Sequence, residues 1–307
     1  LGWIGHGELG YGSVTVRRDL AEQAVDGIAA ALRRSREAAA EAIVQVAVSG
    51  MYKEVSKLAA RGGVDARDFC LMPFGGAGPM LGGLLARELG MREVLVPTTP
   101  GVLSALGGLI ADIRNDFIET VYADLDASTL PRLLEGFARL RAGAMQWLRE
   151  EQGFGEEATL LPSADMRYHG QSFEIEVPLE QHWLAEGDLH AVAEAFHLAH
   201  ERLYGHADRA APIQAIALRI VVVGRVPLPR FPEQERGSGV PDAAGEAEVY
   251  IDGAHRLAKL YRREALRHGH AFAGPCTIMQ EDCTTCVPPG VAGEVDRFGN
   301  LRLGISA

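Results

Sequence analysis

The sequence has no long hydrophobic run and no excess of positive charge. Its 307 residues contain no stretch of the roughly 18 uninterrupted apolar residues that a bilayer-spanning helix needs. The first residues also lack a basic region ahead of an apolar one, so we expect a cytoplasmic location. The net charge of -11 argues against nucleic acid and anionic membranes as partners, because both require clustered cationic surface.

Cysteine is also scarce, since the chain has only Cys70, Cys276, Cys283 and Cys286. Four cysteines are too few for a disulfide scaffold in a chain of this length, so we expect a reducing compartment. Cys283 and Cys286 have CxxC spacing, which is compatible with a zinc or redox site. However, residues three apart in a strand point to opposite faces, and no second CxxC or close histidine pair completes a site. We therefore predict inert cysteines that are buried or half-buried.

What the chain does contain is enough apolar sequence, 47% of its residues, for a substantial core and about two domains. Helical spacing of apolar residues predicts helices over 19–34 and 35–61, the second ending at Gly62 and Gly63. A short apolar run over 69–72, a glycine-rich turn, a helix over 80–89 capped by Gly90 and a strand over 94–96 follow. This order is a βαβ unit, which predicts a parallel sheet covered by helices.

The pattern changes in the second half of the chain. Helices are predicted over 102–110, 130–151 and 188–204, and a strand over 117–122. Alternating apolar residues over 173–177 and 216–222 predict two half-buried strands. The segment 227–246, rich in proline, glycine and acidic residues, is typical of a surface linker, and short strands with tight turns are predicted beyond it.

The turn over 75–79 is the strongest candidate for a nucleotide contact. Glycines let the backbone approach a ligand, and the amides of the following helix present partial positive charge. Pro79 suits the first helical position, where no amide donor is needed. A dinucleotide fingerprint fits poorly, because the strand over 94–96 ends in Pro97 and not in an acidic residue. A P-loop is excluded because no Gly-Lys-Ser/Thr follows, but a plain tight turn stays an open alternative.

Several motifs in one order resemble the hydantoinase A, 5-oxoprolinase and acetone carboxylase β-subunit family. They are residues 74–79 (FGGAGP), 92–97 (REVLVP), 100–107 (PGVLSALG), 167–174 (RYHGQSFE), 200–205 (HERLYG), 274–275, 284–285, 288–290 and 296–301 (DRFGNL). The resemblance implies an α/β fold, a partial actin-like (ribonuclease H-like) ATPase lobe over residues 1–125, followed by an α+β, strand-rich C-terminal domain over 126–307. The helix over 35–61 would connect two lobes.

The same resemblance implies that ATP and Mg²⁺ are cofactors. In actin-like folds a glycine turn near the end of the second lobe contacts the adenosine, which assigns that role to Gly75, Gly76, Ala77, Gly78 and Pro79. Members of the family carry Asp-x-Gly-Gly-Thr turns for the phosphates, and this sequence has none. The glycine-rich loop over 5–10 has no threonine and no following helix. We therefore expect the chain to be the C-terminal part of a family member, without its N-terminal half, and inactive by itself.

The activity that the resemblance implies is phosphorylation of a cyclic amide oxygen, or of a ketone, for hydrolysis or carboxylation. Hydantoin, 5-oxoproline and a ketone all stay open as acceptors. The alternative is a non-catalytic assembly module that binds a hydantoinase B-type partner subunit. In either case we expect a homo- or hetero-oligomer.

Further polar residues are weaker candidates. Arg167, Tyr168, His169 and Gln171 are predicted to face a substrate or a partner subunit, although Arg167 is equally able to pair with an acidic residue, Glu174 or Glu176, across the sheet.

Two histidines and two acidic residues complete the candidates. His197 and His200 share a helix face and could hold a metal, but no Glu follows His197 as in HExxH. We favour packing histidines and predict no metal site. Glu281 and Asp282 are predicted to be solvated turn formers.

Overall fold

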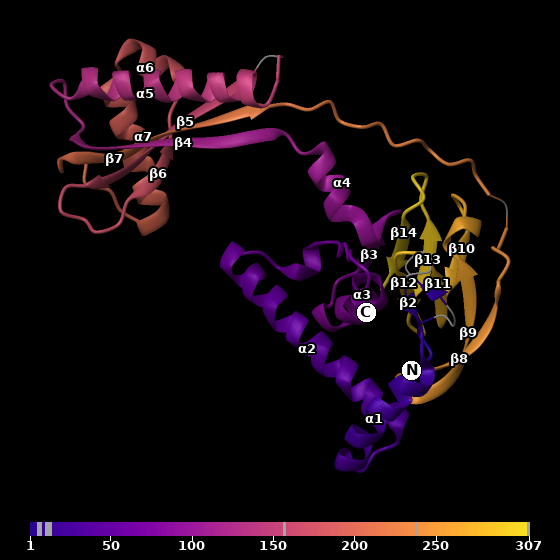
Figure 1. The fold of residues 1–307 in the computed structure, drawn as a ribbon. Helices are drawn as coiled ribbons and strands as arrows, with labels where there is room; N and C mark the ends of the chain where they lie inside the picture. Colours follow the sequence, from indigo (N-terminus) through magenta and orange to yellow (C-terminus); the bar gives the residue numbers. More distant parts are fainter. Residues whose placement is uncertain (5–7, 10–13, 156–157, 238, 306–307) are drawn as a thin grey trace. The chain divides into compact units, whose positions relative to one another are not determined.

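The chain packs as two compact units in a computed structural model that describes residues 1–4, 8–9, 14–155, 158–237 and 239–305 (Figure 1). Unit 1 comprises Leu1–Leu109 and Arg230–Ala307, and unit 2 comprises Ile110–Pro229. The mixed helix-and-sheet architecture that we expected is confirmed. The predicted domains, residues 1–125 and 126–307, stay a prediction. The contacts divide the chain differently, since they group Arg230–Ala307 with Leu1–Leu109.

Local signals set the helix ends of unit 1, and the helices predicted there are confirmed. The Ser35 hydroxyl accepts a hydrogen bond from the amide of Ala38 at the start of the second helix. Gly63 and Gly90 cap two helices in the left-handed conformation, at φ 63° and 66°. The helices are α1 (Arg18–Leu32), α2 (Arg36–Gly62), η1 (Ala66–Asp68), α3 (Gly78–Leu89), η2 (Pro100–Val102) and α4 (Leu103–Ile110).

Unit 1 contains two four-stranded sheets and a short hairpin, β1 (Glu8–Leu9) with β2 (Val14–Thr15). The first sheet has the order β10-β13-β14-β3 and is antiparallel, with β3 (Glu93–Val96), β10 (Ala271–Ala273), β13 (Ala292–Val295) and β14 (Leu301–Gly304). The second has the order β12-β11-β9-β8, with β8 (Gly245–Ile251), β9 (Ala254–Arg262), β11 (Cys276–Met279) and β12 (Thr284–Val287). The short strands predicted for the end of the chain are therefore confirmed.

The predicted parallel pairing around the glycine turn is confirmed at one position only, and the sheet that contains β3 is otherwise antiparallel. β3 pairs antiparallel with β14, and the predicted strand over 69–72 is reduced to one parallel bridge between Leu71 and Val94. Pro73, which lacks an amide proton, follows within two residues and cannot extend the ladder.

The core of unit 1 joins β3 to the C-terminal strand β14. Val94 and Val96 of β3 and Leu301 and Leu303 of β14 are at most 1% exposed and belong to one hydrophobic cluster with α3. Removal of this apolar surface from water stabilises the pairing of strands that lie about 200 residues apart in the sequence.

Unit 2 is an antiparallel sheet packed against helices, in the order β4-β7-β5-β6. Its elements are β4 (Ile113–Asp124), α5 (Leu130–Gln146), η3 (Trp147–Glu151), β5 (Ala158–Tyr168), β6 (Ile175–Pro178), α6 (Gln181–Glu186), α7 (Leu189–Tyr204) and β7 (Ile213–Gly224). The core contains side chains of α5, α7 and the sheet. β7 was predicted to be half-buried, but almost all of it is buried, because it lies between β4 and β5 in the sheet. In the part of the chain that the structure describes, no helix has the length and apolarity to cross a bilayer.

The packing of α7 against the sheet generates the first prediction. Phe196 is fully buried and contacts Tyr168 edge to face, with ring centroids 4.8 Å apart. We expect Phe196→Ala to lower the free energy of unfolding of unit 2 by about 3–5 kcal/mol, because it removes buried surface and leaves a cavity. Urea denaturation measures this change. Phe173→Ala is the matched control, since Phe173 is 79% exposed and should change stability little. Equal effects of the two substitutions would contradict the packing described for α7.

Candidate functional site

The glycine turn is an exposed loop between Leu71 and α3. Gly75 has φ +79°, a conformation that favours glycine, and a β-carbon built there would meet no atom within 4 Å. Its amide donates to the carbonyl oxygen of Pro100 at 2.7 Å. Gly76 and Ala77 are exposed, and Ala77 is the N-cap of α3 without any side chain that could cap it. No side chain at the N-cap therefore binds the first amides of α3, and Pro79 contributes no amide.

Two other glycines near the turn serve packing. A β-carbon on Gly82 would lie 2.7 Å from the Pro73 side chain, and one on Gly83 would lie 2.9 Å from the Pro288 side chain. These glycines therefore let α3 approach its neighbours, and Pro79 is itself buried beneath the turn. Within residues 75–83, Gly76 and Ala77 are exposed, the half-buried residues are Gly75, Gly78, Met80 and Leu81, and the remaining three are buried.

Asp282 contacts the loop that supports the turn. Its Oδ2 accepts a hydrogen bond from the Gly101 amide at 2.9 Å, and a β-carbon on Gly101 would lie 2.5 Å from the same oxygen. Asp282 is half-buried. The prediction that it is a solvated turn former was wrong, because the turn that contains it packs against residues 98–101, far away in the sequence.

Arg263 lies on another side of the same loop. Its Nη2 donates to the carbonyl oxygens of Pro97 and Gly299. Burial lowers the pKa of Arg263 to about 10, while the nearby carboxylates of Asp296 and Asp282 act to raise it. The guanidinium is therefore still charged at neutral pH.

Buried polar atoms without a partner gather in this region of unit 1. Among the described residues, Gln234 Oε1, Arg263 Nη1 and Asp282 Oδ1 are buried and make no hydrogen bond. Gln234 lies beside Gly299, which binds Arg263. Unsatisfied buried groups are uncommon in proteins, so their concentration around residues 97–101 marks this loop as a functional candidate.

The structure brings Tyr168 and Gln171 into a buried network in unit 2. The Tyr168 hydroxyl donates to His197 Nδ1 at 2.8 Å and accepts from the Asp208 amide at 2.9 Å. His200 Nδ1 donates to the His206 carbonyl, so its Nε2 accepts from the Gln171 side chain at 3.1 Å. Burial raises the pKa of Tyr168 and lowers that of His197, which keeps both neutral.

The other two residues of this motif lie elsewhere. Arg167 donates to the side chain of Gln214 and lies over the Tyr122 ring, at 5.8 Å from its centroid, so the predicted pair with Glu174 or Glu176 is wrong. His169 is exposed. That Arg167, Tyr168, His169 and Gln171 contact a substrate or partner stays a prediction.

His197 and His200 are packing histidines, as we favoured, and both are buried. Within the described residues, no three His, Cys, Asp or Glu side chains are grouped to hold a metal ion. The loop over 5–10 that we considered for phosphate binding lies mostly outside the described residues, which include only Glu8 and Leu9 of it.

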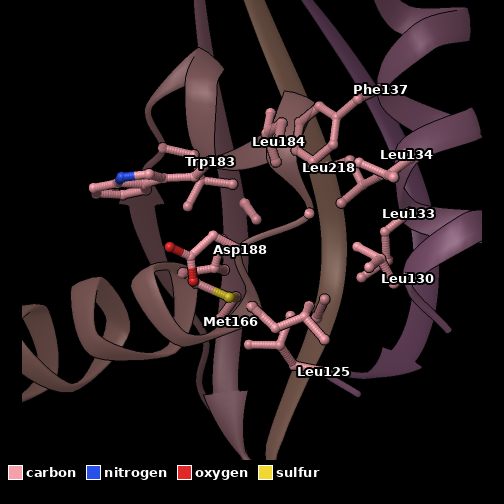
Figure 2. A pocket seen from close by; sticks show the side chains of 16 residues that line it. Leu125, Leu130, Leu133, Leu134, Phe137, Met166, Trp183, Leu184, Asp188 and Leu218 are labelled. Atoms are coloured by element: carbon pink, nitrogen blue, oxygen red, sulfur yellow. The ribbon is translucent and has the colours of Figure 1, made fainter. Parts of the chain in front are cut away.

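Unit 2 also contains an apolar cavity of about 30 Å³ (Figure 2). The labelled side chains around it are mostly leucines, from α5, from α6 (Leu184), from β7 (Leu218) and from the residue after β4 (Leu125), together with Met166 and Trp183. Its one acidic lining residue, Asp188, accepts a hydrogen bond from the Ala191 amide and caps α7. The apolar lining offers no group that could act on a substrate, so we assign no chemistry to this cavity.

A larger pocket, of about 310 Å³, lies in unit 1 between α2, α3 and the β8–β9 hairpin. Arg87 pairs with Asp252 at 2.9 Å there, and Glu41 accepts from the Gly253 amide. Residues of the glycine turn do not line this pocket. The turn and the loop over 97–101 therefore form the candidate site, in which the glycines present backbone and Asp282 fixes the supporting loop.

Two family profiles match the chain. The profile described as Hydantoinase/oxoprolinase matches residues 1–117, and the one described as Hydantoinase/oxoprolinase C-terminal domain matches residues 123–304. An uncharacterized protein of Methanocaldococcus jannaschii is 33% identical over 99% of this chain. Caprolactamase subunit alpha of Pseudomonas jessenii is 30% identical, also over 99%.

Two solved structures have the same fold. The crystal structure of the ATP-dependent caprolactamase from Pseudomonas jessenii has a TM-score of 0.76 and 29% identity, and it covers 99% of this chain. The nucleotide-free acetone carboxylase structure has a TM-score of 0.78 over 96% of this chain at 23% identity, which supports the fold alone. The chain spans only 43–45% of the length of these relatives and structures.

The cysteines confirm the prediction of inert thiols for three positions. Cys276, Cys283 and Cys286 are buried, and burial raises the pKa of each thiol to about 12. Cys70 is exposed, and partial burial raises the pKa of its thiol to a smaller extent. All four are free.

We expect a disulfide reagent such as DTNB to react quickly with only one thiol of the native chain at pH 8. A thiol with a pKa near 12 is ionised to about one part in ten thousand at that pH, and only the thiolate reacts. Absorbance at 412 nm measures the reaction, and unfolding in guanidinium should release the other three. The matched variant Cys70→Ser should lose the fast phase. A fast phase that persists in this variant would contradict the burial of the CxxC pair.

Proposed function

Because the chain belongs to the hydantoinase/oxoprolinase family, we propose that it forms part of an ATP-dependent subunit that activates a cyclic amide. The observation that carries this proposal is the open glycine turn at the N-terminus of α3. There the amide of Gly75, at φ +79°, donates to the carbonyl oxygen of Pro100, and the neighbouring Gly76 and Ala77 are exposed, so that a nucleoside would contact their backbone. Relatives described as ATP-dependent support the same interpretation.

The residues of this chain fit the adenosine side of a nucleotide site. Gly75, Gly76, Ala77 and Gly78 would lie against the nucleoside, and Pro79 would fix the start of α3 without a competing amide. When bound, ATP supplies the phosphoryl group that turns an amide oxygen into a leaving group. Mg²⁺ would accompany the phosphates, which residues beyond this turn would have to hold, because the sequence has no Asp-x-Gly-Gly-Thr turn.

The acceptor class is a proposal of its own. Caprolactamase and 5-oxoprolinase are named for cyclic amides, and acetone carboxylase is named for a ketone. Two of these three kinds of relative are named for cyclic amides, and we therefore propose a cyclic amide as the acceptor for this chain. A panel of caprolactam, 5-oxoproline, hydantoin, and acetone with bicarbonate separates these classes through phosphate release, and stimulation by acetone alone would reject the cyclic amide.

A second candidate function is assembly with a partner subunit. Relatives of this chain are described as subunits, alpha for caprolactamase and beta for acetone carboxylase. In unit 2, the sheet face that carries Ile118 and Leu161 leaves both about half exposed, which suits a protein contact. Co-purification with a hydantoinase B-type subunit would support this function. It is compatible with the first one, and a chain that assembles but shows no ATP-dependent turnover would favour it.

Substitution of Gly75 tests the nucleotide contact. We expect Gly75→Asn to raise the KM for ATP about tenfold or more, which corresponds to about 1.4 kcal/mol of lost binding. Asn tolerates the left-handed conformation better than other residues, so the fold is kept while its side chain fills the open space beside the turn. The assay measures phosphate release with the longest natural form of the protein that contains these residues.

Gly63→Asn is the matched control for this experiment. Gly63 also has positive φ, at 63°, and a β-carbon there would meet no atom within 4 Å, but it caps α2 away from the turn. We expect the KM of this variant to stay at the wild-type value. An unchanged KM for ATP in both variants would contradict the proposed contact between the nucleotide and the turn.

A further inference from the structure

Asp282 has contacts that its exposed neighbours lack. Its Oδ2 binds the Gly101 amide across 181 positions of the sequence. We propose that Asp282 is a positioning residue, which holds the glycine turn in the conformation that receives the nucleotide. This inference rests on the proposed function of the turn, and it adds that the strand-rich end of the chain controls nucleotide affinity.

The helical segment that begins at Pro100 has no capping side chain from its own N-terminal residues. Thr99, the N-cap of η2, makes no hydrogen bond with its side chain, and Pro100 has no amide proton. The first amide that needs an acceptor is therefore that of Gly101, and its acceptor is the Asp282 carboxylate. A negative charge at this end also interacts favourably with the helix dipole. Asp282 therefore acts as the cap of the helical segment from Pro100 to Ile110.

The loop over 98–101, which Asp282 caps, supports the glycine turn over 75–79. The carbonyl oxygen of Pro100 accepts the hydrogen bond of the Gly75 amide at 2.7 Å. The backbone carbonyl of Asp282 also lies 3.6 Å from the place where a β-carbon on Gly76 would be. One residue thus fixes Gly75 through Pro100 and packs directly against Gly76.

The turn containing Asp282 makes two side-chain hydrogen bonds with the supporting loop. The Gln280 side chain donates to the Thr98 carbonyl oxygen at 2.8 Å, while Asp282 binds Gly101. The amide of Gln280 donates to the Cys283 carbonyl oxygen at 3.0 Å, which closes the turn between these two side chains. Displacement of the 280–283 turn would therefore move both ends of the loop over 98–101.

The polar atoms left over are the independent observation. Asp282 Oδ1 and Arg263 Nη1 are both buried without a hydrogen-bond partner among the described residues, and they lie around the same loop. Groups held in this state are typical of functional sites, where local stability is given up for a defined geometry.

The test compares Asp282→Ala with Asp282→Asn in the longest natural form of the protein. We expect Asp282→Ala to raise the KM for ATP about tenfold, with kcat at saturating ATP changed by less than about threefold. Asp282→Asn keeps an oxygen that accepts the Gly101 amide, and it should recover most of the affinity. Glu281→Ala is the matched control, because this neighbouring carboxylate is exposed.

A purely structural cap would give a different result. It would lower the thermal midpoint of Asp282→Ala and leave the KM for ATP unchanged, and this outcome would overturn the inference. If Asp282→Ala fails to fold, Gln280→Ala, which removes the other side-chain contact between this turn and the loop, gives the same comparison, and a wild-type midpoint with a raised KM would support positioning.

Hydrogen exchange separates this inference from the proposed function. Amides of Gly75 and Gly101 should exchange faster in Asp282→Ala than in Glu281→Ala, without any nucleotide present. If the wild type shows no ATP-dependent turnover but the exchange changes as expected, the proposed function fails and the linkage of Asp282 to the turn stands. Unchanged exchange at Gly75 would overturn the linkage, whatever the turnover.

Discussion

The pairing of β14 with β3 is the interaction on which the rest of unit 1 depends. Leu301 lies opposite Val96 and Leu303 opposite Val94, and these four side chains are almost completely buried. Closing a loop of about 200 residues costs conformational entropy, but this cost grows only slowly with loop length. Burial of the two apolar strands offsets it, and the C-terminal segment is thereby held beside the glycine turn.

This constraint explains why the site includes residues that no local pattern relates. The turn over 280–283 and the loop over 98–101 contact each other because the segments that contain them pack into one unit. Arg263, which follows β9, donates to the carbonyl oxygens of Gly299 and of Pro97, and the second of these residues adjoins the same loop. The geometry of the turn is thus a property of the whole unit.

Features governed by neighbouring residues could be predicted from the sequence. The Ser35 cap, the terminating glycines Gly63 and Gly90, and the helix spacing depend on contacts within a few residues. The partner of β3 could not be predicted, because an apolar strand of four residues specifies burial but neither a neighbour nor a direction. For the same reason Asp282 resembled an ordinary turn residue. Its role depends on Gly101, which only tertiary packing brings within reach.

Motifs shared with the family have unequal value as evidence for function. Tyr168 and Gln171, in the motif over 167–174, have their polar groups bound inside unit 2 by His197, His200 and Asp208. These bonds hold the motif in the fold, and its contact with a substrate or partner stays a prediction. The turn over 75–78 differs, since Gly76 and Ala77 are exposed and no atom lies within 4 Å of the place where a β-carbon on Gly75 would be. The proposed nucleotide contact therefore depends on this turn and on the carboxylate that supports it.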